Sequence, residues 1–410
     1  MISHFLVKFF VLYIFLVDGM LGLLYGSNDL TNYLIVLTGL IVPLTMLTSN
    51  SRIFSEFLFL LGLILFVAFS TYNLLIWYIS FEAVVIPMIY LLSKGSSSLL
   101  SRYRAIYRFT LYTILGGLFL LFSLLYMILI TGSTNYYLYL FYNPISISLQ
   151  LYLFPLILIS YLIKLPVIPF HIWLPDTHGE APTSGSVILA ALLLKLGGIG
   201  ILRWLIPLLP YGYIYYRPLI LVLGVLSSLY ASVTTLRHID IKKLIAYSSI
   251  AHMGFILIGI VSFSSIAIQG VILLLISHGL VSSLLFLLVG SIYVRTGTRY
   301  LIYYQGLSTT MPLFSIFLFF ALILNASFPP SLSFVAELLL LQGTFIYETI
   351  GTTIALISVF LSGVYSILLF CKIAFASTST FQFHYQDLTL REFYILLPLV
   401  ILSFALSFII

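Results

Sequence analysis

The sequence predicts an all-α polytopic membrane protein with about thirteen transmembrane helices. Of its 410 residues, 62% are hydrophobic and 7% are charged, whereas a soluble domain carries roughly 25% charged residues. The hydrophobic residues form continuous runs of about 20 residues, which is the length of helix that crosses a bilayer. A membrane β-barrel would instead show short alternating segments. Because a helix satisfies its own backbone hydrogen bonds in lipid, we expect each run to be helical.

Charged residues and residues that favour turns divide the runs and set the limits of each predicted span. The first run begins close to Met1, and no cleavage site of small residues follows it, so we expect it to remain as a span. Basic loops at 50–53, 94–105, 237–242 and 294–309 all fall on one side of the membrane if the spans alternate, as the positive-inside rule requires. The predicted spans are 5–25, 32–49, 54–71, 73–93, 106–131, 150–172, 182–205, 218–236, 243–263, 267–293, 310–347, 351–376 and 392–409.

Two of these spans contain prolines that should interrupt a helix. The stretch KLPVIPFHIWLP at 164–175 has three prolines at the end of one apolar run, and NASFPPSLSF at 325–334 lies inside another. Each proline removes a backbone donor and crowds the preceding turn. Because interrupted helices at matching positions of two repeats mark the transport site in many transporters, we expect these two breaks to be functional.

A set of ionisable residues lies inside the predicted spans or beside the two breaks. A charged side chain at mid-span costs roughly 2.5–3.5 kcal/mol on insertion scales, so such residues are usually functional. A buried group whose charged partner can move has two proton affinities, which favours a proton path with Glu82 and Lys164 as its first acid–base pair. A structural ion pair, or hydrogen-bonded packing for the histidines, is the alternative. The candidate residues are Glu82, Lys164, Lys195, His252, His278 and Glu337.

The spacing of these residues suggests an internal repeat. Three positions recur at offsets of 170 (252−82), 173 (337−164) and 177 (372−195), where the last pairs Lys195 with Lys372. Such an offset spans five helices, and an odd number inverts the second copy. We therefore predict two inverted five-helix repeats, each with one Pro-broken helix. The predicted segments are 1–53 (shortened peripheral N-terminal helices), 54–205 (first repeat), 206–376 (second repeat) and 377–410 (C-terminal helix).

Other chemistries find little support in the sequence. The single Cys371 excludes a disulfide within these residues and a cluster or zinc site held by several thiolates. The net charge of +6 is explained by basic loops, so we expect no nucleic-acid partner. The polar residues His171, Asp176, His178 and Glu180 resemble a metal cluster by composition, but we interpret them as the polar cap of a loop. No Rossmann fingerprint or phosphate loop is present, and we predict no metal or cofactor site.

Three motifs carry a resemblance to a known family. KLPVIPFHIWLPDTHGEAPTSGSVILAALLLKLGGIG at 164–200, KKLIAYSSIAHMG at 242–254 and SHGLVSSLLF at 277–286 closely resemble the antiporter-like membrane-arm subunits of respiratory complex I. The resemblance covers roughly residues 27–376. It implies about fourteen helices in two inverted repeats, so the N-terminus is expected to be short by about one helix. It also implies roles for the candidates: Glu82 as channel carboxylate, Lys164 as broken-helix lysine, Lys195 as connecting lysine, His252 and His278 as central histidines, and Glu337 as the broken-helix glutamate leading to the exit.

The resemblance implies a proton-translocating subunit of NADH:ubiquinone oxidoreductase. Protonation would pass laterally from Glu82 to Glu337, driven by quinone reduction elsewhere. FMN, iron–sulfur clusters and ubiquinone are expected in partner subunits, with none in this chain. The expected partners are other membrane-arm subunits, including two antiporter-like paralogues, and membrane lipids. The expected location is the mitochondrial inner membrane, with a bacterial plasma membrane as alternative. The rival interpretations are a subunit of a multisubunit cation/proton antiporter and a bundle that only holds other subunits.

Overall fold

The computed structural model describes residues 30–49, 51–95, 98–142, 145–375 and 385–409 as an all-helical chain. Within this part there is no β-strand, only the isolated bridges Asn73↔Asn135 and Asp240↔Tyr300. Eleven helical segments in the described part are long and apolar enough to cross a membrane, if Leu74–Ser93 and Thr183–Leu208 are each counted as one segment, and two shorter apolar helices accompany them. The predicted fold class is therefore confirmed. The predicted span 5–25 lies outside the described residues.

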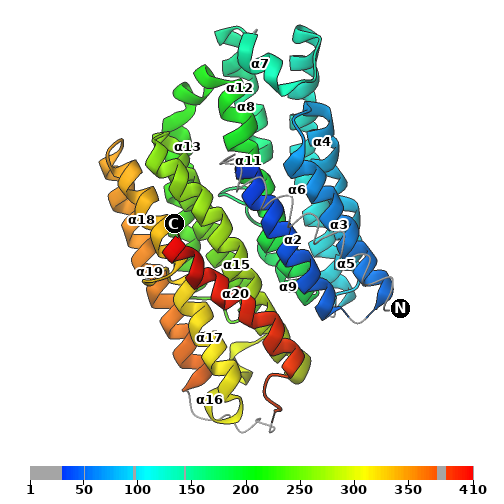
Figure 1. Cartoon of the computed structure of the whole chain (residues 1–410), viewed down its shortest axis with the longest axis vertical. Coiled ribbons are helices and arrows are strands. Elements are labelled where there is room, and N and C mark those ends of the chain that lie inside the picture. Colours follow the sequence, from blue (N-terminus) through cyan, green and yellow to red (C-terminus); the bar gives the residue numbers. More distant parts are fainter. Residues whose placement is uncertain (1–29, 50, 96–97, 143–144, 376–384, 410) are drawn as a thin grey trace. The chain divides into compact units, whose positions relative to one another are not determined.

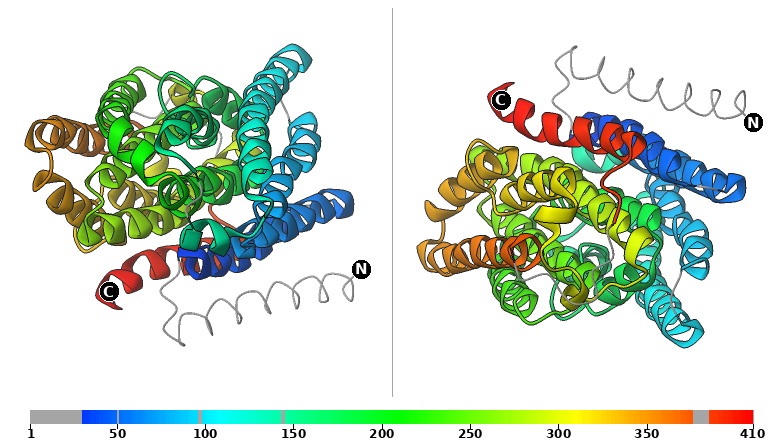
Figure 2. Two further views of the ribbon diagram at one scale, coloured as in Figure 1. Left: turned by 90° about the horizontal axis from the view of Figure 1, so that it is seen from above. Right: turned by 90° about the horizontal axis from the view of Figure 1, so that it is seen from below.

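The chain forms two compact units, Met1–Leu219 and Ile220–Ile410. In the first unit α2 and α3 lie side by side (Figure 2), and α6 packs against α4, α8 and α9. Serine and asparagine side chains cap the N-termini of α3, α4 and α6, where backbone donors lack helical partners. The helices are α2 (Leu30–Thr48), α3 (Arg52–Ser70), α4 (Leu74–Ala83), α5 (Val85–Ser93), α6 (Leu99–Thr131), α7 (Tyr136–Tyr142), α8 (Ile147–Lys164), α9 (Trp173–Glu180), α10 (Thr183–Ile188), the π-helix η1 (Leu189–Leu193), α11 (Leu194–Ile199), the π-helix η2 (Gly200–Leu205) and α12 (Ile206–Leu208).

The second unit is built around α15. This helix packs against α14, α17 and α18, and α20 runs obliquely across α15 and α17 (Figure 1). Close approach of α15 and α18 depends on Gly270, where a methyl group would lie 2.5 Å from the Leu340 nitrogen. The helices are the second part of α13 (Pro210–Thr235), then α14 (Ile241–Ser262), α15 (Ser265–Thr296), the 3₁₀-helix η3 (Leu301–Tyr303), α16 (Leu307–Thr310), α17 (Pro312–Asn325), α18 (Leu332–Phe345), α19 (Thr349–Ala374) and α20 (Leu390–Ile409).

Both predicted proline breaks are confirmed. Helix α8 ends at Lys164 and α9 begins at Trp173, with turns between them, while α17 ends at Asn325 and α18 begins at Leu332. A third interruption was not predicted. It separates α4 from α5 at Val84, three residues before Pro87. Pro87 has no N–H group to donate to the carbonyl of Ala83, four residues earlier. It therefore weakens the helix directly after Glu82.

The domain limits of the sequence analysis stay predictions. Packing divides the chain between Leu219 and Ile220, inside α13, whereas the sequence places a repeat boundary between 205 and 206. The inverted relation of the two repeats likewise stays a prediction. Its weakest position is Lys372, which lies in the last turn of α19 and is exposed to the surroundings.

Candidate functional site

Glu82 lies at the interruption between α4 and α5. Its carboxyl is packed against Gly117 of α6, where a methyl group would lie 2.4 Å from Oε1. Oε1 is buried and has no hydrogen-bond partner in the described part of the chain. The carboxyl of Glu82 is therefore held by packing and by the charge of its neighbour rather than by a donor.

Lys164 is the last residue of α8 and is only 4% exposed. Its Nζ donates to the Phe81 carbonyl at 3.3 Å and stands 4.6 Å from the centre of the Phe81 ring. Lys164 and Glu82 interact electrostatically. The structure thus brings the predicted acid–base pair together around Phe81, the residue directly before Glu82.

Lys195 is completely buried in α11, between the π-helices η1 and η2. Its Nζ donates to the carbonyl of Ala190, five residues earlier, at 2.7 Å. The wide turns of a π-helix are rare and occur often at functional sites. The local geometry therefore gives this ammonium group an acceptor from its own span.

His252 of α14 and Glu337 of α18 form an acid–base pair in the second unit. Their Nδ1 and Oε1 atoms are 3.3 Å apart, and both side chains are nearly fully buried. The two atoms are within ion-pair distance but are not aligned as a hydrogen bond. The ring of His278, on α15, lies 5.7 Å from that of His252, centre to centre. Three of the predicted site residues are thus adjacent.

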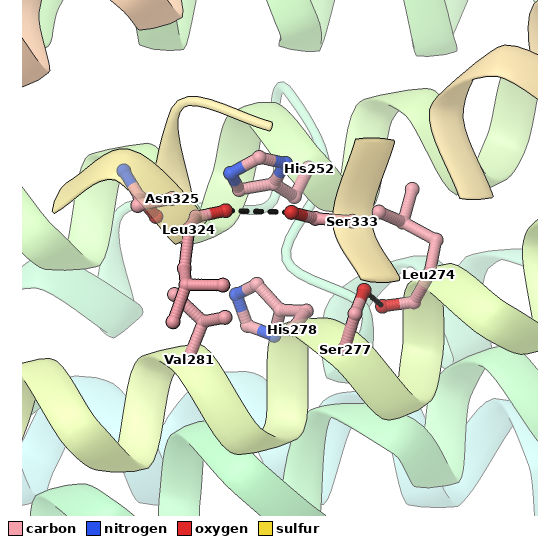
Figure 3. A pocket seen from close by; sticks show the side chains of 8 residues that line it. All are labelled: His252, Leu274, Ser277, His278, Val281, Leu324, Asn325 and Ser333. Atoms are coloured by element: carbon pink, nitrogen blue, oxygen red, sulfur yellow. Dashed lines mark hydrogen bonds between the residues drawn. The ribbon is translucent and has the colours of Figure 1, made fainter. Parts of the chain in front are cut away.

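A small cavity lies between the two histidines (Figure 3). It has room for about one water molecule. Figure 3 shows the two imidazole rings on opposite sides of the hydrogen bond that Ser333 donates to the Leu324 carbonyl at 2.6 Å. The other lining residues are Leu274, Ser277, Val281 and Asn325.

Several residues near the candidate groups were missed by the sequence analysis. The Tyr365 side chain of α19 is 2% exposed and interacts with Glu337, with Asn325 and Ser248 among its polar neighbours. Asn325 could have been found, because it is a polar residue that ends an apolar run at a proline break. Tyr365 carries no such signal in a chain with 30 tyrosines.

The interpretation of His171, Asp176, His178 and Glu180 as a loop cap is wrong for the last three, which lie in helix α9 and whose acids contact α6. Asp176 pairs with Arg108 of α6, and Glu180 accepts a hydrogen bond from Ser101 at 3.2 Å. Among the residues that the structure describes, no group of three His, Cys, Asp or Glu side chains is arranged to hold a metal ion. Their contacts tie the segment after the first break to the first turns of α6.

Comparison with known proteins identifies the family of the chain. The family model described as "NADH:quinone oxidoreductase/Mrp antiporter, TM" matches residues 71–364. NADH-ubiquinone oxidoreductase chain 4 of Chondrus crispus is 43% identical over 384 residues, covering 92% of this chain and 78% of that protein. The chain 4 protein of Arabidopsis thaliana is 39% identical over 383 residues, covering 92% and 77%.

Solved structures show the same fold. A chain of respiratory complex I from Thermus thermophilus superposes with a TM-score of 0.85 at 27% identity, covering 92% of this chain and 80% of that one. A chain of the Mrp complex from Dietzia sp. has a TM-score of 0.89 at 18% identity, covering 98% and 89%, and this likeness concerns the fold alone. The chain therefore belongs to the NADH:quinone oxidoreductase/Mrp antiporter family of membrane subunits, and its relatives within that family include the chain 4 subunits of NADH-ubiquinone oxidoreductase.

Proposed function

We propose that this chain translocates protons, as a membrane subunit of NADH:ubiquinone oxidoreductase, through two groups of ionisable side chains within the helix bundle. The first group is Glu82, Lys164 and Lys195, and the second is His252, His278 and Glu337. The observation that carries the proposal is the second group, in which a buried His–Glu pair and a second histidine surround a cavity of water size. Such groups exchange protons over hydrogen-bond distances, directly or through one water.

In the first unit the acid and the base have different local partners. The Lys164 ammonium is held by the Phe81 carbonyl, while the Glu82 carboxyl lacks a donor. A change in the separation of these two charges changes the proton affinity of both, because each stabilises the charged form of the other. Movement at the breaks beside them would therefore load or release a proton.

In the second unit His252 stands between an acid and another base. Nδ1 of His252 lies 3.3 Å from Oε1 of Glu337, and the cavity beside them is lined by both His252 and His278. Polar side chains at the break, Asn325 and Ser333, line the same space. A lateral passage of protonation from the first group to the second stays a prediction.

The energy must come from outside this chain. Moving one proton against 100 mV requires about 2.3 kcal/mol, and we propose that quinone reduction in partner subunits supplies it. FMN, iron–sulfur clusters and ubiquinone would belong to those subunits, and two antiporter-like paralogues would be among the membrane neighbours.

The chain 4 relatives support the mitochondrial inner membrane as the location. The fold shared with an Mrp subunit favours a cation/proton antiporter as the second candidate. Co-purification with quinone-reductase subunits would separate these two functions.

The test is Lys164→Ala in the assembled complex. Protons translocated per electron are measured in sealed membrane vesicles, together with the rate of quinone reduction. We expect the stoichiometry to fall, because the Glu82 carboxyl loses the only cation with which it is paired in the proposal. Lys94→Ala is the matched control, since Lys94 is an exposed lysine at the end of α5. An unchanged stoichiometry for Lys164→Ala rejects the role.

A further inference from the structure

The Glu82 carboxyl occupies a niche on α6 that exists only because residue 117 is glycine. A methyl group on Gly117 would lie 2.4 Å from Oε1, 2.5 Å from Cδ and 2.9 Å from Oε2. Ordinary van der Waals contacts between carbon atoms are about 3.5–4.0 Å. All three atoms of the carboxyl group would therefore have to move before any other residue could replace Gly117.

The neighbouring glycine has a different environment. A methyl group on Gly116 would meet Cδ1 of Ile163 at 3.2 Å and Cα of Ser160 at 3.5 Å, and no atom of Glu82 is among its nearest contacts. Gly116 thus serves the packing of α6 against α8, where the end of an isoleucine side chain can give way. Both glycines lie in the interior of a helix of 33 residues, where a glycine is less favourable than alanine by about 1 kcal/mol.

The niche matters because no donor holds the carboxyl group of Glu82. Oε1 is buried without a hydrogen-bond partner in the described part of the chain, and the electrostatic attraction of Lys164 acts on it. A side chain held in this way takes the position that packing allows. The surface of α6 at Gly117 therefore determines where the Glu82 carboxyl group lies.

We propose that Gly117 is a positioning residue for the Glu82 carboxyl, and that its missing side chain is what admits this carboxyl group to its place near Lys164. The inference rests on the proposed function of Glu82 and Lys164 in proton transfer. Gly117 itself neither binds nor transfers a proton. It acts only through the location of the acid.

The experiment places Gly117→Ala in the assembled complex and measures protons translocated per electron and the rate of translocation. A displacement of about 1 Å at a reacting group can lower a rate up to a hundredfold, and we expect a loss of about tenfold. Gly116→Ala is the matched control, with the same added methyl group one residue away, and should pump as the wild type does. Unchanged pumping in Gly117→Ala overturns the proposal.

Two further backgrounds separate positioning from packing. In Glu82→Asp the acid is one methylene shorter and withdraws from α6, so adding Gly117→Ala should lower its remaining activity by less than twofold. In Glu82→Ala the niche is vacant, so adding Gly117→Ala should leave the thermal inactivation temperature of the complex unchanged or raise it. When Glu82 is present, Gly117→Ala should lower this temperature. Equal losses in all backgrounds, or an equal loss in Gly116→Ala, assign Gly117 to helix packing and overturn the proposal.

Failure of the proposed function has its own signature. If the single variant Glu82→Ala, with Gly117 unchanged, translocates protons as the wild type does, the proposed function is wrong. That result removes both the role of Glu82 and the reason to position it. A defective Glu82→Ala together with a normal Gly117→Ala removes only the positioning role.

Discussion

The buried pair of His252 and Glu337 allows the sharpest test of the second proton group. The perturbation is Glu337→Gln, which keeps the shape of the side chain and removes its charge and its proton. The partner, His252, then faces an amide instead of a carboxylate across the 3.3 Å contact between Nδ1 and Oε1. Because both side chains are nearly fully buried, bulk water does little to replace the lost charge.

The size of the effect follows from this geometry. When His252 is protonated and Glu337 is ionised, unit charges 3.3 Å apart interact by about 5 kcal/mol at an effective dielectric constant of about 20. A difference of about 1.4 kcal/mol changes the ratio of two protonation states tenfold. If neighbouring polar groups and water reduce the interaction to about a quarter, proton transfer through this pair should still slow by about tenfold.

The assay is proton translocation per electron in sealed vesicles, with the amount of assembled complex measured in parallel. We expect Glu337→Gln to lose about tenfold in the rate of translocation, while Glu348→Gln, at the N-terminus of the next helix, behaves as wild type. Glu337→Asp keeps a titratable group and should fall between the two. Wild-type translocation by Glu337→Gln in normally assembled complex would refute the reasoning from the ion pair.

Two further predictions concern the frame that holds this pair. Arg295 donates to both carboxylate oxygens of Glu392, at 2.9 and 2.6 Å, so Glu392→Gln should weaken the joint between α15 and α20 by about 1.5–3 kcal/mol. A lower thermal inactivation temperature with unchanged protons per electron is expected, and an unchanged temperature would contradict it. Gly270→Ala places a methyl group 2.5 Å from the Leu340 nitrogen, and backbone atoms yield less than side chains. We expect less assembled complex on native gels, and wild-type amounts would show that α15 and α18 separate easily.

The spans could be predicted because the apolar runs are long and their separators are strongly polar. The two breaks could be predicted because prolines at 166, 169 and 175, and at 329 and 330, act locally on backbone hydrogen bonds. The interruption at Val84 was missed. Its signal is the single Pro87, and one proline in a membrane helix is often accommodated without a break.

The site was predictable at the level of its ionisable residues and not at the level of their partners. Glu82, Lys164 and Lys195 stand out because charge is rare in the spans. Their contacts are with backbone carbonyls, at Phe81 for Lys164 and Ala190 for Lys195. Every residue has a carbonyl, so no sequence pattern identifies which one a buried lysine will contact. Tertiary packing decides it.

The two units hold their acids in different ways, and this difference bears on how protons would move. In the first unit Lys164 donates its hydrogen bond to the Phe81 carbonyl and interacts with the Glu82 carboxyl only electrostatically. In the second unit Glu337 lies in direct ion-pair contact with His252. A carboxylate in contact with a cation holds its charge more tightly than one that is only near it.

Each acid lies near a point where the regular helix is interrupted. A continuous helix moves as a rigid rod, so it would shift an acid and its packing neighbours together. An interruption lets one half of a helix turn while the other half stays. Glu82 lies two residues before the Val84 break, and Glu337 follows the break between α17 and α18. Small rotations at these points would change the separation of Glu82 from Lys164 and of Glu337 from His252. A proton relay needs such a change in separation.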